Sequence, residues 1–331
     1  MGESCFIKVL LNVKPNKIIH LQKLVHSNLS LETKIDLVKE LLKILFENVD
    51  GKFLVHFSGG KDSLVMLHLV KEVCDEYGFD KDRVIVFHVD TGNHFPGTVN
   101  YVLKIINEFK FSNYIIFKPI VSIWWIFRRF GFPPFTSIYY EENRQGRFSY
   151  PCCFILKKLP TYITIELVKE VKCDMLGIRA FGEALRRTLT VKERGIVFRY
   201  SREHNLKLSR EIVRVYPIAY FSNRDIHEYI KKFNLELNPV YKYCSRHGCI
   251  VCTAGYYDMS EFEKEISKIN QKLVQFVKSK INEWKFMHER KKEIQEFKKK
   301  LREYVRKNIR KWKTIDEAIH NIRNYIYTQY K

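Results

Sequence analysis

The chain has 331 residues, of which 46% are hydrophobic and 14% aromatic, so it can bury a large core and is not an intrinsically disordered protein. Its formal net charge of +21 favours polyanionic partners such as nucleic acid, anionic lipid or phosphate-bearing substrates. No stretch reaches the roughly 20 uninterrupted apolar residues that a bilayer crossing needs, and the first residues lack a basic segment followed by an apolar one. We therefore expect a cytoplasmic protein with no membrane partner.

Residues 1–50 form an N-terminal extension that we expect to be largely helical. Its apolar side chains recur at helical spacing, which predicts a helix whose role is packing. These side chains are Ile35, Leu37, Val38, Leu41, Leu42 and Leu45.

From residue 51 onward, short β-rich runs alternate with helical stretches. Strands are predicted at 53–57, 84–89, 114–117, 175–178 and 212–216, and helices at 63–77, 98–109, 122–129, 154–171 and from 222 or 223 to about 233. This alternation predicts an α/β fold with a doubly wound, mostly parallel sheet. The pattern ends near residue 255, so we assign the nucleotide-binding domain to 51–255. Residues 256–331 are helical, basic and rich in spaced aromatic side chains.

A glycine-rich turn lies directly between the first strand of this domain and the following helix. Such a turn gathers backbone N–H groups and the positive end of the helix dipole around one point, where a pyrophosphate can bind. The glycines allow close approach, the serines can donate hydrogen bonds, Lys61 supplies charge, and Asp62 caps the helix or helps to hold magnesium. The spacing is not that of a Walker A loop, and the alternative is an ordinary glycine turn. The turn comprises Ser58, Gly59, Gly60, Lys61, Asp62 and Ser63.

This turn resembles the PP-loop of the N-type ATP pyrophosphatases, and residues 89–96 resemble the second signature of the phosphoadenosine phosphosulfate (PAPS) reductase family. Further matches are Gly177–Ala180 with Glu183 and Arg187, Tyr216–Ile218, Asp225–Ile226 and Asn238–Tyr241. The resemblance covers roughly residues 50–255.

The resemblance implies a fold similar to the adenine nucleotide α-hydrolases, with ATP and magnesium at the carboxyl ends of the strands. It implies nucleotide binding by the turn, Asp90, Thr91, Gly177 and Arg179, and catalytic roles for Lys61, Asp62, Asp90 and Arg179. The alternatives are a turn-forming role for Asp90 and a surface salt bridge for Arg179.

Four of the eight cysteines form two close pairs, Cys152-Cys153 and Cys249-x-x-Cys252. A C-x-x-C spacing lets two thiolates reach one metal centre. The arrangement resembles the 4Fe-4S ligand set of adenylylsulfate reductases and of relatives that insert sulfur into nucleic acids. Zinc is the rival metal, and two inert buried pairs are the third alternative.

The other cysteines have weaker assignments. Cys244 is a candidate sulfur carrier or a bystander beside the metal site. Cys5, Cys74 and Cys173 are expected to be packing residues.

Sulfonucleotide reductases attack their substrate with a cysteine in a C-terminal segment, yet no cysteine follows Cys252 in this sequence. The intact turn instead suits ATP, whose pyrophosphate leaves when an acceptor oxygen is adenylylated; a sulfur donor, which could be a separate protein, then displaces AMP. We expect sulfur transfer of this kind, with sulfite-releasing reduction and non-catalytic nucleotide binding as alternatives.

The acceptor is expected to be tRNA or DNA. The basic stretch 285–313 offers phosphate contacts, and Trp284, Tyr304 and Trp312 offer rings for base stacking; the alternative is a helical bundle whose aromatic residues pack inward. A basic path toward the nucleotide is expected from Arg144, Arg147, Arg186 and Arg187.

Overall fold

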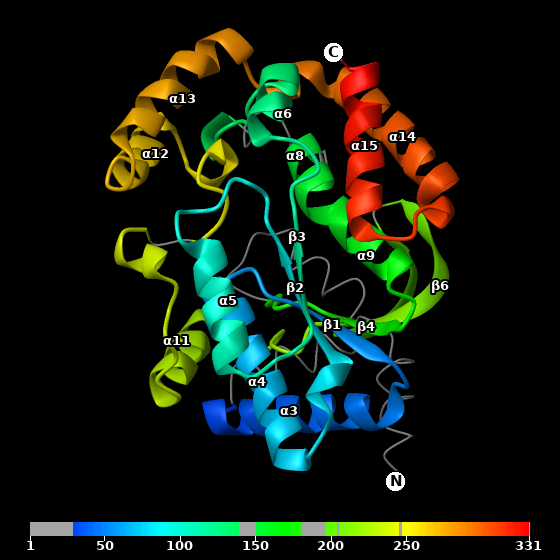
Figure 1. The fold of residues 1–331 in the computed structure, drawn as a ribbon. Helices are drawn as coiled ribbons and strands as arrows, with labels where there is room; N and C mark the ends of the chain where they lie inside the picture. The colour runs from blue at the N-terminus through cyan, green and yellow to red at the C-terminus, as the bar shows by residue number, and fades with distance from the viewer. Residues whose placement is uncertain (1–28, 139–149, 181–195, 204, 245–246, 331) are drawn as a thin grey trace.

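A computed structural model describes residues 29–138, 150–180, 196–203, 205–244 and 247–330 of the chain (Figure 1). Six strands form one sheet in the order β3-β2-β1-β4-β6-β5. The strands are β1 (Lys52–His56), β2 (Val84–Val89), β3 (Tyr114–Phe117), β4 (Val171–Met175), β5 (Val197–Glu203) and β6 (Leu206–Val215). All neighbours pair in parallel except β5, which runs antiparallel to β6 at one edge. The predicted α/β fold with a mostly parallel sheet is confirmed.

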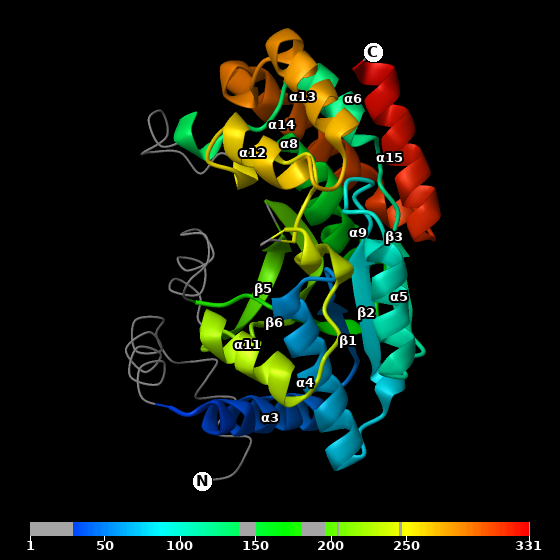
Figure 2. The ribbon, with the colours of Figure 1, turned by 90° about the vertical axis from the view of Figure 1, so that its left-hand side faces the viewer.

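Helices cover both faces of the sheet (Figure 2). One face carries α3 (Leu31–Asn48), α4 (Lys61–Tyr77), α5 (Thr98–Glu108) and α11 (Asn223–Lys232). The other carries α6 (Ile123–Phe130) and the continuous segment of α8 (Pro151–Cys153), a π-helical turn (Phe154–Lys158) and α9 (Leu159–Leu167). None of the described helices is long and apolar enough to cross a membrane.

Alternation along the central strands separates two hydrophobic cores. Phe53 and Val55 point to the α3–α4 side, whereas Leu54 points to the α9 side, because successive strand residues face opposite ways. The helix predicted in the N-terminal extension is confirmed as α3, and it is fixed by a buried ion pair of 2.7 Å between Lys34 and Asp225 of α11.

The strand predicted at 175–178 is wrong. The strand is β4 at Val171–Met175, and the apolar residues after it form the connection that crosses the N-terminus of α4. A Cβ on Gly177 would lie 3.1 Å from Ser63 Cα, so this close approach of two backbones replaces strand pairing.

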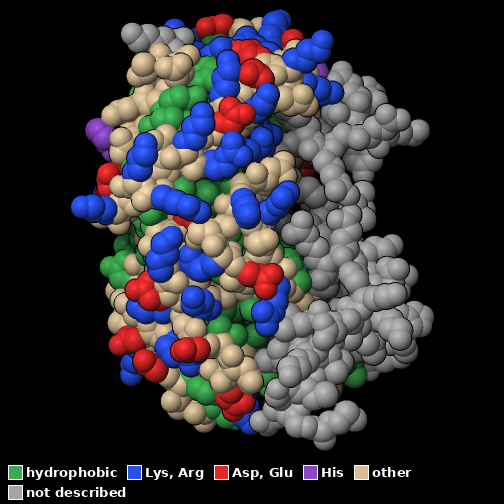
Figure 3. All heavy atoms as spheres, turned by 90° about the vertical axis from the view of Figure 1, so that its right-hand side faces the viewer, with side chains coloured by type: hydrophobic (Ala, Val, Ile, Leu, Met, Phe, Trp, Pro, Cys, Tyr) green, Lys and Arg blue, Asp and Glu red, His purple; other side chains and the backbone are tan. Residues whose placement is uncertain are grey.

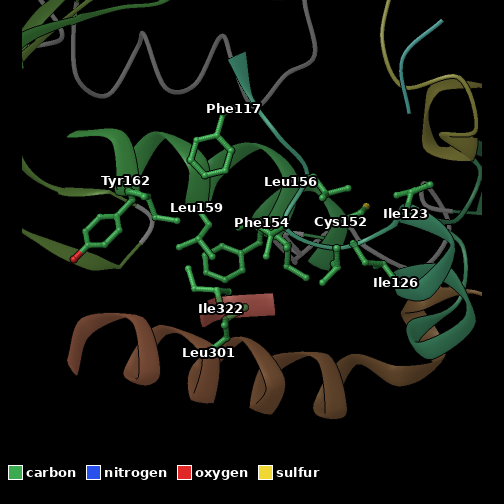
Figure 4. Packing of buried hydrophobic residues seen from close by; sticks show 14 of the residues in the cluster. Phe117, Ile123, Ile126, Cys152, Phe154, Leu156, Leu159, Tyr162, Leu301 and Ile322 are labelled. Atoms are coloured by element: carbon green, nitrogen blue, oxygen red, sulfur yellow. The ribbon is translucent and has the colours of Figure 1, made fainter. Parts of the chain in front are cut away.

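The C-terminal region contains α12 (Met259–Ile266), α13 (Gln271–Trp284), α14 (Lys291–Asn308) and α15 (Ile315–Gln329). Its core is continuous with that of the sheet: Leu301 of α14 and Ile322 of α15 pack with Phe154 and Leu159 in one cluster (Figure 4). Burial on this scale stabilises the fold by roughly 1.5–3 kcal/mol for each large apolar side chain.

The aromatic side chains proposed to stack on bases pack inward instead. Trp284 stacks on Phe132 with ring centroids 5.7 Å apart, and Tyr304 stacks on Tyr325 at 3.9 Å. Trp312 is buried. This packing favours the packed-bundle alternative over base stacking, because an amphipathic helix turns its aromatic stripe toward the core.

Candidate nucleotide site and cysteine cluster

The glycine-rich turn leaves the carboxyl end of β1 and enters α4 in a conformation that only small residues allow. Gly59 has a φ of +82°, and a Cβ there would lie 3.2 Å from Val102 Cγ2. Gly60 is the N-cap of α4 and supplies no capping side chain. The Ser58 and Ser63 hydroxyls lie 3.0 Å apart across the turn. The turn therefore presents a positive helix end framed by two hydroxyl groups.

The Lys61 ammonium points toward the N-terminus of a second helix, α11. It donates to Asn223 Oδ1 at 2.8 Å and lies 3.1 Å from His227 Nε2. Burial and the Lys61 and Arg179 charges lower the pKa of His227, so its imidazole is neutral and can accept from the ammonium. The cationic side chains of Lys61 and Arg179 and the N-termini of α4 and α11 thus converge on one region, which is suited to a polyphosphate.

Arg179 and Asp62 form an ion pair at the edge of this region, with Nε 3.3 Å from Oδ1. Arg179 is only 3% exposed, so the surface salt bridge considered for it is excluded. Gly177 lies against the backbone of Ser63. The structure thus brings Arg179, Asp62 and Gly177 to the start of α4.

Asp90 and Thr91 follow β2, the strand next to β1. The Asp90 carboxylate accepts from the Gly92 N–H at 2.8 Å, and Thr91 is buried with its hydroxyl accepting from the Asn93 N–H at 3.2 Å. Both residues therefore shape the turn at the carboxyl edge of the sheet, which is the edge that holds the phosphate loop.

Several side chains that brace the loop were not predicted as site residues. The Lys61 N–H donates to the Tyr241 hydroxyl at 3.1 Å, and Asn238 Nδ2 donates to the Gly59 carbonyl at 3.3 Å. Their motif, Asn238–Tyr241, was the available sequence signal. Asn223 and His227 gave no comparable signal, because their contact with Lys61 depends entirely on the fold.

Three imidazoles lie between the phosphate loop and the C-x-x-C segment. The His88 and His94 rings are 5.0 Å apart, and those of His94 and His247 are 6.4 Å apart. Burial is the main cause that lowers all three pKa values, to about 4 for His88 and about 3 for His247, so the rings are neutral at pH 7. They add polar but uncharged walls to the site.

The C-x-x-C segment docks on the second signature. Cys249 forms a β-bridge with His94, and the Ile250 N–H donates to the Asn93 carbonyl at 2.8 Å. This pairing carries the segment to the sheet edge where the nucleotide site lies.

The two cysteine pairs, far apart in sequence, meet in space. A hydrogen bond with Cys153, burial, and the charges of Cys153, Cys252 and Cys249 raise the pKa of Cys152. The Cys249 charge is the main cause that raises the pKa of Lys157. Within the described part of the chain, however, no group of three or more His, Cys, Asp or Glu side chains is arranged to hold a metal ion.

The other cysteines that the structure describes, Cys74, Cys173 and Cys244, are buried. Cys244 donates to the Glu265 carbonyl at 3.9 Å and is 3% exposed, so in this conformation it packs, which favours the bystander alternative over the sulfur carrier. Cys74 and Cys173 pack as predicted, and burial raises the pKa of Cys74 to about 12.

The basic path at Arg144, Arg147, Arg186 and Arg187 lies outside the described residues, as do Glu183 and Cys5.

Comparisons with known proteins identify the family of this chain. Residues 52–255 match the phosphoadenosine phosphosulfate reductase domain. The chain is 22% identical over 206 residues to the phosphoadenosine 5'-phosphosulfate reductase of Vibrio parahaemolyticus, covering 62% of this chain and 67% of that protein. It is 23% identical over 218 residues to the adenosine 5'-phosphosulfate reductase of Anoxybacillus flavithermus, covering 66% and 79%.

Solved structures give more distant likenesses. The U34-tRNA thiolase of Methanococcus maripaludis with its 4Fe-4S cluster aligns at a TM-score of 0.41 with 14% identity, covering 80% of each chain. The PAPS reductase of Candida auris aligns at 0.42 with 18% identity, covering 72% of this chain and 97% of that one. Because the domain match extends over more than half of its residues, this chain belongs to the phosphoadenosine phosphosulfate reductase family.

Proposed function

We propose that this protein cleaves ATP to AMP and pyrophosphate in order to adenylylate an acceptor, nucleic acid, for sulfur transfer. The observation that carries the proposal is the intact phosphate loop, whose Lys61 ammonium lies between the N-termini of α4 and α11. A ligand with a terminal pyrophosphate uses every part of that arrangement.

The chemistry is in-line displacement at the α-phosphorus. An acceptor oxygen forms a bond to that phosphorus, and the bond to the bridging oxygen of pyrophosphate breaks. Lys61 and the two helix ends stabilise the charge that develops on the leaving group, and Arg179 orients the α-phosphate or the acceptor. A sulfur nucleophile from a donor then displaces AMP from the adenylylated acceptor.

Magnesium would share the neutralisation of the phosphates when bound with ATP. Asp62 and Asp90 are the carboxylates at this edge of the sheet that would hold it, directly or through water.

The cysteine cluster fits a 4Fe-4S group by the chemistry of its donors. The two cysteine pairs lie close enough for the charges of Cys153, Cys252 and Cys249 to raise the pKa of Cys152, although the described residues are not arranged to hold a metal ion in this structure. Lys157 lies close enough for the Cys249 charge to raise its pKa. Cys152, Cys153, Cys249 and Cys252 would hold the cluster, which would supply a fixed charge beside the nucleotide. Zinc on the same thiolates is the rival assignment.

A second candidate function is reduction of a sulfonucleotide with release of sulfite. The curated relatives named above are reductases of this kind. Against it, Cys244 is buried and no cysteine follows Cys252 in this sequence, so the sequence shows no C-terminal thiol for the attack.

The proposal is tested by anaerobic purification and an assay of pyrophosphate release from ATP and magnesium, with and without tRNA or DNA. We expect release that depends on nucleic acid. Sulfite production from PAPS or adenylylsulfate with a thiol would establish the reductase instead. ATP binding with no pyrophosphate release under any condition would leave only a nucleotide-binding protein.

The Cys249→Ser substitution should abolish the proposed 4Fe-4S cluster. We expect the anaerobically purified protein to absorb at about 400 nm, as iron–sulfur chromophores do. The Cys249→Ser variant should lose both this absorption band and its bound iron. Cys244→Ser is the matched control and should keep both. Zinc in place of iron in the wild-type protein, measured by elemental analysis, would contradict the assignment.

A further inference from the structure

The outward face of α14 carries a straight row of cations. Lys292, Lys299 and Arg306 are exposed and follow each other at intervals of seven residues. Seven residues are close to two helical turns, so the three side chains project in nearly the same direction and span about 21 Å. None of the three has an ion-pair partner among the described carboxylates; Glu293 and Glu296 of the same helix pair with Arg129 and Lys300.

The row continues onto the sheet edge. Arg310 and Lys313 are exposed beyond the end of α14, in and after the short 3-10 helix Ile309–Lys311. Burial and Glu166 raise the pKa of Tyr162, while the charges of Arg310 and Arg306 act in the opposite direction, which places both guanidinium groups near Tyr162. The Tyr162 hydroxyl in turn donates to the Lys207 carbonyl at 3.3 Å.

The β5–β6 hairpin adds two exposed cations that face each other. Arg202 and Lys207 are direct cross-strand partners. Like charges at directly opposite positions destabilise a hairpin, whereas the like charges of the helix row repel one another more weakly, because about 10 Å separates each from the next. Figure 3 views this side of the molecule and shows blue Lys and Arg side chains crowding the face, with acidic groups scattered among them. Binding of a polyanion would remove this repulsion.

The chemistry of the face distinguishes among polyanionic partners. The described residues of α14, the 3-10 helix after it and the β5–β6 hairpin contain no exposed large hydrophobic side chain. A membrane-surface helix presents Trp, Phe or Leu beside its cations, and a protein interface is anchored by buried aromatic residues. A nucleic-acid backbone needs neither. In B-form DNA the phosphates of one strand repeat about every 3.4 Å of helix axis, so about six lie alongside a row of this length.

We propose that this α14–hairpin face, made of Lys292, Lys299, Arg306, Arg310, Lys313, Arg202 and Lys207, binds the phosphate backbone of the nucleic acid that serves as acceptor. Only the identification of this nucleic acid as the acceptor rests on the proposed function; the binding surface itself does not depend on catalysis. On this proposal the α14–hairpin face recognises phosphates rather than stacked bases, so its contact with nucleic acid is independent of base sequence.

The test compares two triple variants that remove the same charge. The first, Lys292→Gln/Lys299→Gln/Arg306→Gln, lies in the row. The second, Lys264→Gln/Lys268→Gln/Lys272→Gln, lies on and between α12 and α13, at the opposite side of the C-terminal region in Figure 1, where the three lysines are also exposed and without ion pairs to described residues. Fluorescence anisotropy with labelled tRNA and with duplex DNA, over a range of salt concentrations, gives Kd for each.

We expect the row variant to raise Kd at least about tenfold near 0.1 M salt and to lower the slope of log K against log salt by about 3. The control variant should match wild type. Whichever of the two probes wild type binds more tightly distinguishes RNA from DNA as the source of the phosphates. Equal losses in both variants would reduce the effect to net charge, and a normal Kd in the row variant would overturn the assignment. The assignment would also be overturned if the row variant lost binding to phosphatidylserine vesicles but kept binding to tRNA and DNA.

Pyrophosphate release measured on the same preparations separates the two proposals. If no acceptor supports release but the row variant alone loses nucleic-acid binding, the proposed function fails and the binding surface stands. If nucleic acid stimulates release equally in wild type and the row variant, the proposed function stands and the surface fails.

Discussion

Replacement of Lys61 with alanine should lower the rate of pyrophosphate release at saturating ATP by about 10²–10³-fold, the usual cost of removing one group that stabilises developing charge. The ammonium is held by Asn223 Oδ1 and His227 Nε2, so it is positioned before substrate binds. Charge on the pyrophosphate grows as its bond to the α-phosphorus breaks, and a preorganised cation therefore acts more strongly on the transition state than on bound ATP.

The distribution of this loss between kcat and KM tests the role. A fall in kcat with little change in KM is expected; a raised KM at normal kcat would make Lys61 a ground-state binding residue only. Lys231→Ala is the matched control, because Lys231 is an exposed lysine on α11, the helix that holds the Lys61 ammonium, and it should keep wild-type kinetics. Turnover that survives loss of Lys61 would move the active site elsewhere.

The parts of the fold that local chemistry specifies were predictable. The phosphate loop, β1, β2, β3 and the helices α3 to α6 follow from glycines between a β-rich run and a helical run, and from apolar periodicity. The edge strand β5 was missed, because Arg199 and Arg202 interrupt its apolar pattern and its pairing is with a later strand. The end of β4 was misplaced because the close approach of Gly177 to Ser63, rather than propensity, ends the strand.

The candidate site was predictable only as far as its motifs. Ser58–Ser63 and the two cysteine pairs each have a local signature, and the position of the phosphate loop at the carboxyl edge of the sheet follows from parallel strands. The bracing contacts of Lys61 with Asn223 and His227 join positions far apart in the chain, and no local pattern indicates them. The inward packing of Trp284, Tyr304 and Trp312 could not be predicted, because composition identifies basic helices with aromatic residues but not which helical face is buried.

Substitution within a buried polar network of the sheet is expected to have the largest effect on stability. Asp174 of β4 is fully buried; its Oδ1 lies 2.7 Å from His56 Nε2, and its Oδ2 accepts from Arg214 Nε at 2.8 Å and from the Tyr200 hydroxyl at 3.0 Å. The Asp174→Asn variant keeps the volume but removes the charge, leaving the buried Arg214 guanidinium uncompensated. We expect a loss of about 3–5 kcal/mol in the free energy of unfolding, measured by urea denaturation.

The same strands supply the control. Glu211→Gln removes the carboxylate of an exposed pair, Arg199–Glu211 at 3.4 Å, and should cost at most about 1 kcal/mol. Despite burial, the Arg214 and His56 charges hold the pKa of Asp174 below its usual value of 3.8, so its stabilisation is present above that pH and is lost as the pH falls below it. The stability deficit of Asp174→Asn relative to wild type should therefore become smaller in acid, because protonation removes from the wild-type protein the charge that the variant already lacks. A deficit as small as that of Glu211→Gln would show that the network contributes little, and the phosphate loop that follows His56 would then owe its position to the apolar cores alone.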